Sequence, residues 1–134
     1  MVAFLISNIS LAGCDLAVFV KSKTADKKAM SISAMITEFA SGIAEPSIFG
    51  VCFKEKTPLI GNIFGCMIAG AVQGLLTVHC YTFAFPCIPT ILMFYSVDDP
   101  VNLWKAAAVA VVSFAASFMI TALVYRETEK DSAD

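Results

Sequence analysis

The chain has 134 residues, of which 58% are hydrophobic and 15% charged, with a mean hydropathy of +0.79 and a formal net charge of -2. A soluble domain is about 45–50% apolar and about 25% charged, so both deviations indicate a protein embedded in lipid. The small negative charge supplies no basic field, which argues against nucleic acid as a partner. The five cysteines form no Cys-x-x-Cys pair, and we interpret them as small apolar fillers of membrane helices rather than metal ligands or disulfide partners.

Four apolar segments follow one another along the chain, at residues 1–20, 29–53, 58–80 and 103–125. The first, third and fourth are each about as long as a helix that spans a bilayer. The first carries Asp15 and has no basic leader before it, which argues against a cleaved secretory peptide. We therefore predict an all-α integral membrane protein with about three transmembrane helices.

Basic residues gather in three places, at 21–28, 54–56 and 126–130, and lysine and arginine favour the cytoplasmic side of a membrane. If all three clusters are cytoplasmic, residues 29–53 must leave and return on the same side. With about 25 residues this segment is too short for two crossings, so a re-entrant helical hairpin fits, with its break near Gly42–Pro46. The alternative is a single kinked span, which places one basic cluster outside.

The third segment carries a ladder of small residues, in which Gly61 and Gly65 form a G-x-x-x-G pair that Ala69 and Gly70 extend. Such ladders let helix backbones approach closely in lipid. We predict that this face packs inside a helix bundle. Self-dimerisation through the same face is the alternative.

The stretch SGIAEPSIFGV, residues 41–51, places the carboxylate of Glu45 inside an apolar segment. An ionisable group there is costly and by default suggests function. Pro46 removes a backbone donor, while Gly42 and Gly50 permit an unwound backbone. A carboxylate can accept hydrogen bonds from two hydroxyls at once, so we predict a polyhydroxylated or cationic ligand. Alternatively, Glu45 lies at a hairpin tip in the headgroup region and is merely solvated.

Three further polar residues are candidates for lining the same path. Glu38 lies seven residues before Glu45, so both would share a face of a continuous helix; a solvated position near the membrane surface is the alternative. Asn8 and Asp15 are also seven residues apart and lie within the first apolar segment. We expect no catalytic residue, no metal site and no cofactor in this chain.

The same stretch resembles the G-I-T-E-P-A-I-Y-G-V signature of the membrane-spanning C component of enzyme II in the phosphoenolpyruvate-dependent sugar phosphotransferase system, in its glucose, sucrose and β-glucoside superfamily. Nearly all of the chain resembles this family in register. The supporting segments are SNISLAGCDLAVFVKSK, SISAMITEFASG, KEKTPLIGNIFGCMIAGAVQGLL, YTFAFPCIPTI and NLWKAAAVAVVSFAASFMITALVYRE.

This resemblance implies a ten-helix sugar permease with re-entrant hairpins that forms a homodimer in the bacterial cell membrane. Residues 1–126 would be the C-terminal part of its membrane domain, and residues 127–134 a polar cytoplasmic tail. The signature glutamate, here Glu45, would bind sugar hydroxyls with help from the surrounding positions Gly42, Ala44 and Pro46. The implied partners are the sugar, membrane lipid, the remaining helices of the C component, and the A and B components.

The chain departs from the family pattern at several positions. Ala44 replaces the usual threonine or serine, and Leu11 and Ala12 stand where the family often has Gln-Gly. His79 does not match the family's second polar sugar-site residue, and we interpret it as a boundary or packing histidine. No cysteine or histidine matches a phosphorylated residue of the B or A component. The intact system is a sugar phosphotransferase, but whether this chain belongs to an enzyme stays open.

Three functions follow from these observations. The first is the C-terminal portion of a permease of the sucrose or β-glucoside type, which translocates a sugar that the B component phosphorylates. The second is a truncated or split gene product without independent transport, a remnant or an assembly partner, because Met1 would fall inside the family's membrane domain. The third is an unrelated small membrane protein that packs against or regulates a larger complex.

Overall fold

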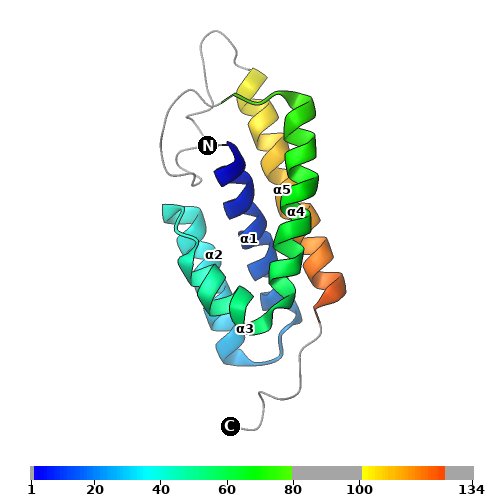
Figure 1. The fold of residues 1–134 in the computed structure, drawn as a ribbon. Helices are drawn as coiled ribbons and strands as arrows, with labels where there is room; N and C mark the ends of the chain where they lie inside the picture. The colour runs from blue at the N-terminus through cyan, green and yellow to red at the C-terminus, as the bar shows by residue number, and fades with distance from the viewer. Residues whose placement is uncertain (1, 80–100, 126–134) are drawn as a thin grey trace.

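The computed structural model describes residues 2–79 and 101–125, and this part of the chain contains helices and no strands (Figure 1). Its elements are α1 (Val2–Lys21), α2 (Ala25–Ser41), the π-helix η1 (Pro46–Cys52), α3 (Phe53–Glu55), α4 (Thr57–Leu76) and α5 (Val101–Val124). Of these, α1, α4 and α5 are long and apolar enough to cross a membrane. The prediction of an all-α membrane protein with about three spans is confirmed.

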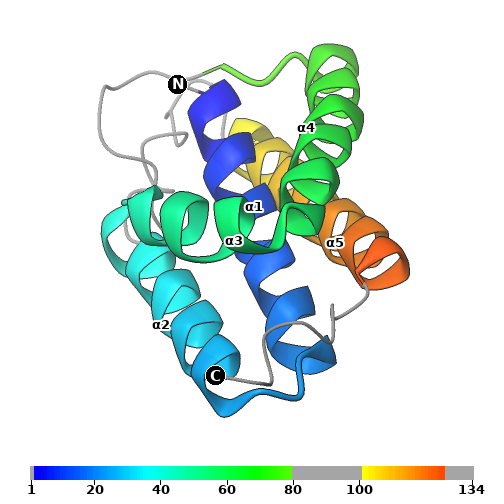
Figure 2. The ribbon, with the colours of Figure 1, turned by 60° about the horizontal axis from the view of Figure 1, so that its bottom comes forward.

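The helices α2 and η1 form a hairpin that begins and ends at the same end of the bundle. In Figure 1, α1 and α5 run from top to bottom and α4 runs back up, whereas α2 rises only part of the way before the chain returns to the bottom through η1 and α3. This is the layout of a re-entrant hairpin rather than of a single kinked span. Figure 2 shows the hairpin beside α1 from the bottom end.

A left-handed glycine ends α2. Gly42 has a φ of 72°, a conformation that residues with a Cβ adopt only at a cost, and its N–H donates to the carbonyl of Glu38 at 2.8 Å. Residues 42–44 are not helical, and Glu45 leads into η1 with Pro46 at its first position. Proline suits a first helical position because no N–H is needed there. The break therefore falls within the predicted stretch Gly42–Pro46.

Helix α1 is the central element, because most of it is buried while α4 and α5 expose most of their surface. One apolar cluster joins α1 to α4, α5 and the segment after α4; its members are Val2, Leu5, Ile6, Ala69, Val78, Ala106 and Val109. A second cluster joins α1 to the hairpin and the end of α5, through Val18, Ala34, Val51 and Tyr125. The first cluster therefore contacts the N-terminal part of α1, and the second contacts its C-terminal part.

Small residues set the close approach of α4 to α5. A Cβ on Gly61 would lie 1.9 Å from Thr121 Oγ1, and one on Gly65 would lie 2.7 Å from Ser117 Cβ. A Cβ on Gly70 would meet nothing within 4 Å. The prediction that Gly61 and Gly65 pack inside the bundle is confirmed, but Gly70 does not take part in this contact.

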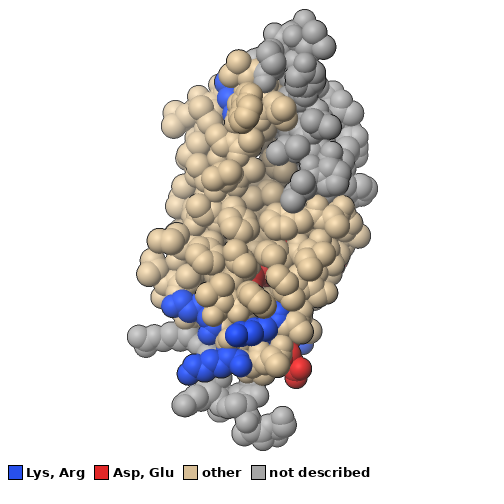
Figure 3. Space-filling view, turned by 180° about the vertical axis from the view of Figure 1, so that it is seen from behind, with Lys and Arg blue, Asp and Glu red and all other residues tan. Residues whose placement is uncertain are grey.

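The charged residues of the described chain divide unevenly between its two ends. Figure 3 shows lysines gathered at the lower end of the bundle, where residues 21–28 and 54–56 lie. The third basic cluster, at 126–130, and the proposed tail at 127–134 lie outside the described residues. Two of the three clusters thus meet at one end, as the hairpin layout requires.

Candidate functional site

The break between α2 and η1 presents a carboxylate. Glu45 and Pro46 are exposed, Ala44 is half-buried and Gly42 is buried. Within residues 2–79 and 101–125, the Glu45 carboxylate makes no hydrogen bond or ion pair. The predicted site residues therefore lie together at the break, and the side chain of Glu45 is exposed there.

Two polar side chains of α1 hold the two sides of this break. Asn8 is buried, and its Nδ2 donates to the carbonyl of Gly42 at 2.9 Å. Asp15 is also buried, and its Oδ2 accepts a short hydrogen bond from the hydroxyl of Ser47. Because Asn8 and Asp15 are seven residues apart, they lie on one face of α1 and fix Gly42 and Ser47 at once.

The structure thus gives Asn8 and Asp15 a contact that the sequence interpretation did not include. Both were candidates for lining a path, and both are packed against the hairpin instead of facing open space in the described part of the chain. Whether they also line a sugar path stays a prediction. Ser47 was missed, although a polar residue directly after Glu-Pro in an apolar segment is the signal that could have found it.

Glu38 is the second carboxyl group inside the bundle. It is 2% exposed, and neither of its carboxyl oxygens has a hydrogen-bond partner among the described residues. Oδ1 of Asp15 is also without a partner there. Burying such groups is costly. Because the helix breaks between Glu38 and Glu45, one is buried while the other is exposed, and the shared face of a continuous helix does not form.

The other polar candidates lie away from the break. The backbone of His79 is bridged by Asn102, whose Oδ1 accepts from the His79 N–H at 3.0 Å and whose Nδ2 donates to the His79 carbonyl at 2.7 Å. This contact ties the segment after α4 to the start of α5, in keeping with a boundary position for His79. In the described part of the chain, no group of three or more histidine, cysteine or acidic side chains could hold a metal ion.

The fold and the break together define a class of protein. The chain is a helical membrane protein whose re-entrant hairpin packs against a central helix and presents an unpaired carboxylate beside unwound backbone. Interrupted helices of this kind occur at the substrate sites of transporters.

Comparison with known proteins identifies the relatives of this chain. It is 30% identical over 118 residues to the arbutin-, cellobiose-, and salicin-specific EIIBC component of the phosphotransferase system (PTS) of Escherichia coli (strain K12), a match covering 88% of this chain and 24% of that protein. It is 30% identical over 128 residues to the sucrose-specific EIIBCA component of Pediococcus pentosaceus, covering 96% and 19%. It is 30% identical over 117 residues to the sucrose-specific EIIBC component of Bacillus subtilis (strain 168), covering 85% and 25%.

These matches confirm the resemblance to enzyme II of the sugar phosphotransferase system over most of the chain. The chain is a relative of the sugar-specific EIIBC and EIIBCA components and corresponds to part of them. It spans about a fifth to a quarter of the length of these proteins. No protein-family model matches the chain, and no solved structure matches it.

Proposed function

We propose that this chain is part of a sugar permease of the phosphotransferase system, of the sucrose or β-glucoside type. It would help to bind a sugar and pass it across the bacterial cell membrane, where the B component phosphorylates it. Its partners would be the remaining helices of the C component, the A and B components and a second copy of the permease, with the C-terminus cytoplasmic. Similarity to sucrose-specific and arbutin-, cellobiose-, and salicin-specific proteins supports the sugar class.

The observation that carries the proposal is the exposed, unpaired carboxylate of Glu45 at the hairpin break. A sugar offers neighbouring hydroxyl donors, and a carboxylate can accept two of them. The backbone beside this carboxylate is unwound at residues 42–44, and Pro46 supplies no N–H to the turn. Asn8 bonds to Gly42 and Asp15 to Ser47, so the chain is held to α1 on both sides of Glu45.

The environment of the break favours a wet path over lipid. A charged side chain at the centre of a bilayer costs about 2.5–3.5 kcal/mol on insertion scales. Non-helical backbone at membrane depth is tolerated only where protein or a water-filled cavity surrounds it. We therefore infer that the outer side of residues 42–45 faces the sugar path, which the remaining helices of the permease complete.

The phosphate chemistry belongs, in this proposal, to the other components. A nucleophilic cysteine needs a positive, accessible setting. Cys14 and Cys52 are buried and Cys66 is half-buried, and Cys14 accepts a hydrogen bond from Thr121 Oγ1 at 3.2 Å. Cys80 and Cys87 lie outside the described residues. The role proposed for this chain is therefore to hold sugar, not to carry phosphate.

Uptake by the organism that encodes the chain tests the proposal with every natural partner present. Cells lacking the coding sequence, and the same cells carrying it on a plasmid, are compared for uptake of labelled sucrose, cellobiose, salicin, arbutin and glucose. We expect the deletion to abolish uptake of at least one of these sugars and the plasmid to restore it. Unchanged uptake of all five sugars in the deleted cells would contradict the proposal.

A further inference from the structure

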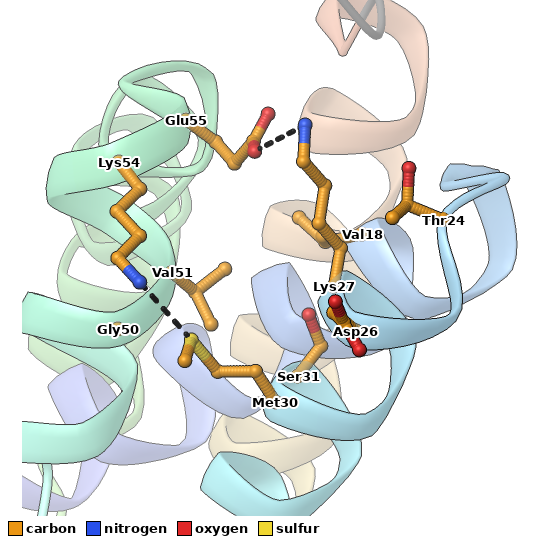
Figure 4. Close-up of a pocket in the computed structure, with 10 residues that line it drawn as sticks. All are labelled: Val18, Thr24, Asp26, Lys27, Met30, Ser31, Gly50, Val51, Lys54 and Glu55. Carbon is orange, nitrogen blue, oxygen red and sulfur yellow. Dashed lines mark hydrogen bonds and ion pairs between the residues drawn. The ribbon is translucent and has the colours of Figure 1, made fainter. Parts of the chain in front are cut away.

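A pocket of about 460 Å³ lies at the lysine-rich end of the bundle, away from the hairpin break (Figure 4). It lies between the end of α1, the start of α2, and η1 with α3. Its lining residues are Val18, Thr24, Asp26, Lys27, Met30, Ser31, Gly50, Val51, Lys54 and Glu55. This volume falls within the range of about 300–1,000 Å³ that small-molecule sites occupy.

The charge at this end of the bundle favours an anion. Residues 21–28 and 54–56 contain six lysines and two acidic residues, Asp26 and Glu55. One of these lysines, Lys27, pairs with Glu55 at 2.9 Å and is therefore neutralised. The ammonium of Lys54 lines the pocket without a carboxylate partner in the described part of the chain; its Nζ lies 3.9 Å from the sulfur of Met30. Lys54 is thus a cation available to a ligand.

A buried hydroxyl gives the pocket a second polar group. Ser31 is 1% exposed, and its Oγ has no hydrogen-bond partner among the described residues. Figure 4 shows its hydroxyl directed into the space between Val51 and the side chains of Asp26 and Lys27. A buried hydroxyl without a hydrogen-bond partner is energetically costly. A ligand oxygen in the pocket would remove this cost.

The remaining groups suit a ligand with both an anionic and an organic part. The first turn of the 17-residue helix α2 borders the pocket, and a helix N-terminus favours negative charge. Asp26 lies in that turn and opposes the field, so the helix end alone would not select an anion. Val18, Met30 and Val51 supply apolar walls.

We propose that this pocket binds an organic phosphate monoester. The phosphate, which carries up to two charges and three acceptor oxygens, accepts from the Lys54 ammonium, and a further oxygen of the ligand accepts from the Ser31 hydroxyl. The organic part lies against Val18, Met30 and Val51. Such a group is present both on soluble phosphorylated sugars and on the headgroup of phosphatidic acid, and the experiment separates these two sources. The proposal goes beyond sugar binding at Glu45 and does not depend on it.

Equilibrium binding to the purified full chain in a neutral detergent tests the proposal. The soluble probes are glucose 6-phosphate, glucose and glucuronate, measured by calorimetry. The lipid probe is phosphatidic acid in mixed micelles of the same detergent, compared with phosphatidylcholine in the same micelles. We expect saturable binding of glucose 6-phosphate or of the phosphatidic acid micelles that an excess of glucose does not displace. Lys54→Gln should weaken that binding about 10-fold or more, as the loss of a charge-assisted hydrogen bond implies.

Two further variants separate the pocket from its surroundings. Ser31→Ala should weaken binding about 3-fold or more without loss of stability, because its hydroxyl makes no hydrogen bond in the described chain. Lys21→Gln removes an exposed lysine at the same end that does not line the pocket, and it should change affinity less than 2-fold at moderate salt. No saturable binding of either phosphate probe, equal binding of glucuronate, or equal losses in Lys54→Gln and Lys21→Gln would each overturn the proposal.

Discussion

The contact between α4 and α5 makes a quantitative prediction for Gly65. In Gly65→Ala the new Cβ would lie 2.7 Å from Ser117 Cβ, 2.9 Å from Ser10 Oγ and 3.0 Å from Ser117 Cα. The last of these atoms is backbone, so no rotation of a side chain relieves the contact and the two helices must separate. Overpacking of this kind costs about 1–3 kcal/mol, whereas alanine in place of glycine within a helix gains at most about 1 kcal/mol.

We therefore expect Gly65→Ala to be less stable than the wild type by about 1–2 kcal/mol, measured by denaturant unfolding in detergent with circular dichroism. Gly70→Ala is the matched control, because the same substitution one and a half turns further along α4 meets nothing within 4 Å. It should leave stability unchanged or raise it by up to about 1 kcal/mol. The reasoning is refuted if Gly65→Ala is as stable as Gly70→Ala.

Three further predictions concern the hairpin break. Asn8→Ala removes the donor to the Gly42 carbonyl, and such bonds in membranes are worth about 0.6 kcal/mol on average. We expect the free energy of unfolding to fall by about 0.5–1.5 kcal/mol and amide hydrogen exchange at residues 42–48 to be faster than in the wild type. Unchanged exchange at these residues would contradict the role of this hydrogen bond. Gly42→Ala places a Cβ at a φ of 72° and should cost about 1–2 kcal/mol in the same unfolding assay, and an equally stable variant would show that α2 ends differently. Ser47→Ala leaves the buried Asp15 side chain without its donor and should lower the free energy of unfolding by about 1–3 kcal/mol. Ser47→Thr keeps the hydroxyl and should recover part of that loss. Equal stability of the two variants would contradict the hydrogen bond.

Much of the fold is predictable because lipid imposes strong rules on sequence. The spans α1, α4 and α5 follow from length and apolar composition, and the hairpin follows from the positions of the basic residues and the shortness of residues 29–53. Glu45 and the break around it stand out because a charge, a proline and a glycine are rare together in such a segment. Each of these signals is local in the sequence.

The contacts that hold the site were not predictable in the same way. The bond between Asp15 and Ser47 joins residues 32 apart, and only the packing of the hairpin on α1 brings them together. The burial of Glu38 follows from the same packing, since a continuous helix would have placed it on the face of Glu45. Local pattern also does not separate Gly65 from Gly70, because the position of α5 decides which of them needs to lack a Cβ.

The role of Glu45 is tested most directly by the sugar concentration that gives half-maximal uptake, in deleted cells carrying the gene on a plasmid. Glu45→Gln keeps the shape of the side chain but removes its charge, so we expect this concentration to rise about 10-fold or more, as the loss of charge-assisted hydrogen bonds implies. Ser41→Ala, an exposed residue at the end of α2, is the local control and should leave it unchanged. An unchanged half-maximal concentration in Glu45→Gln, with protein levels equal to wild type, would contradict the assignment of Glu45 as the sugar-binding carboxylate.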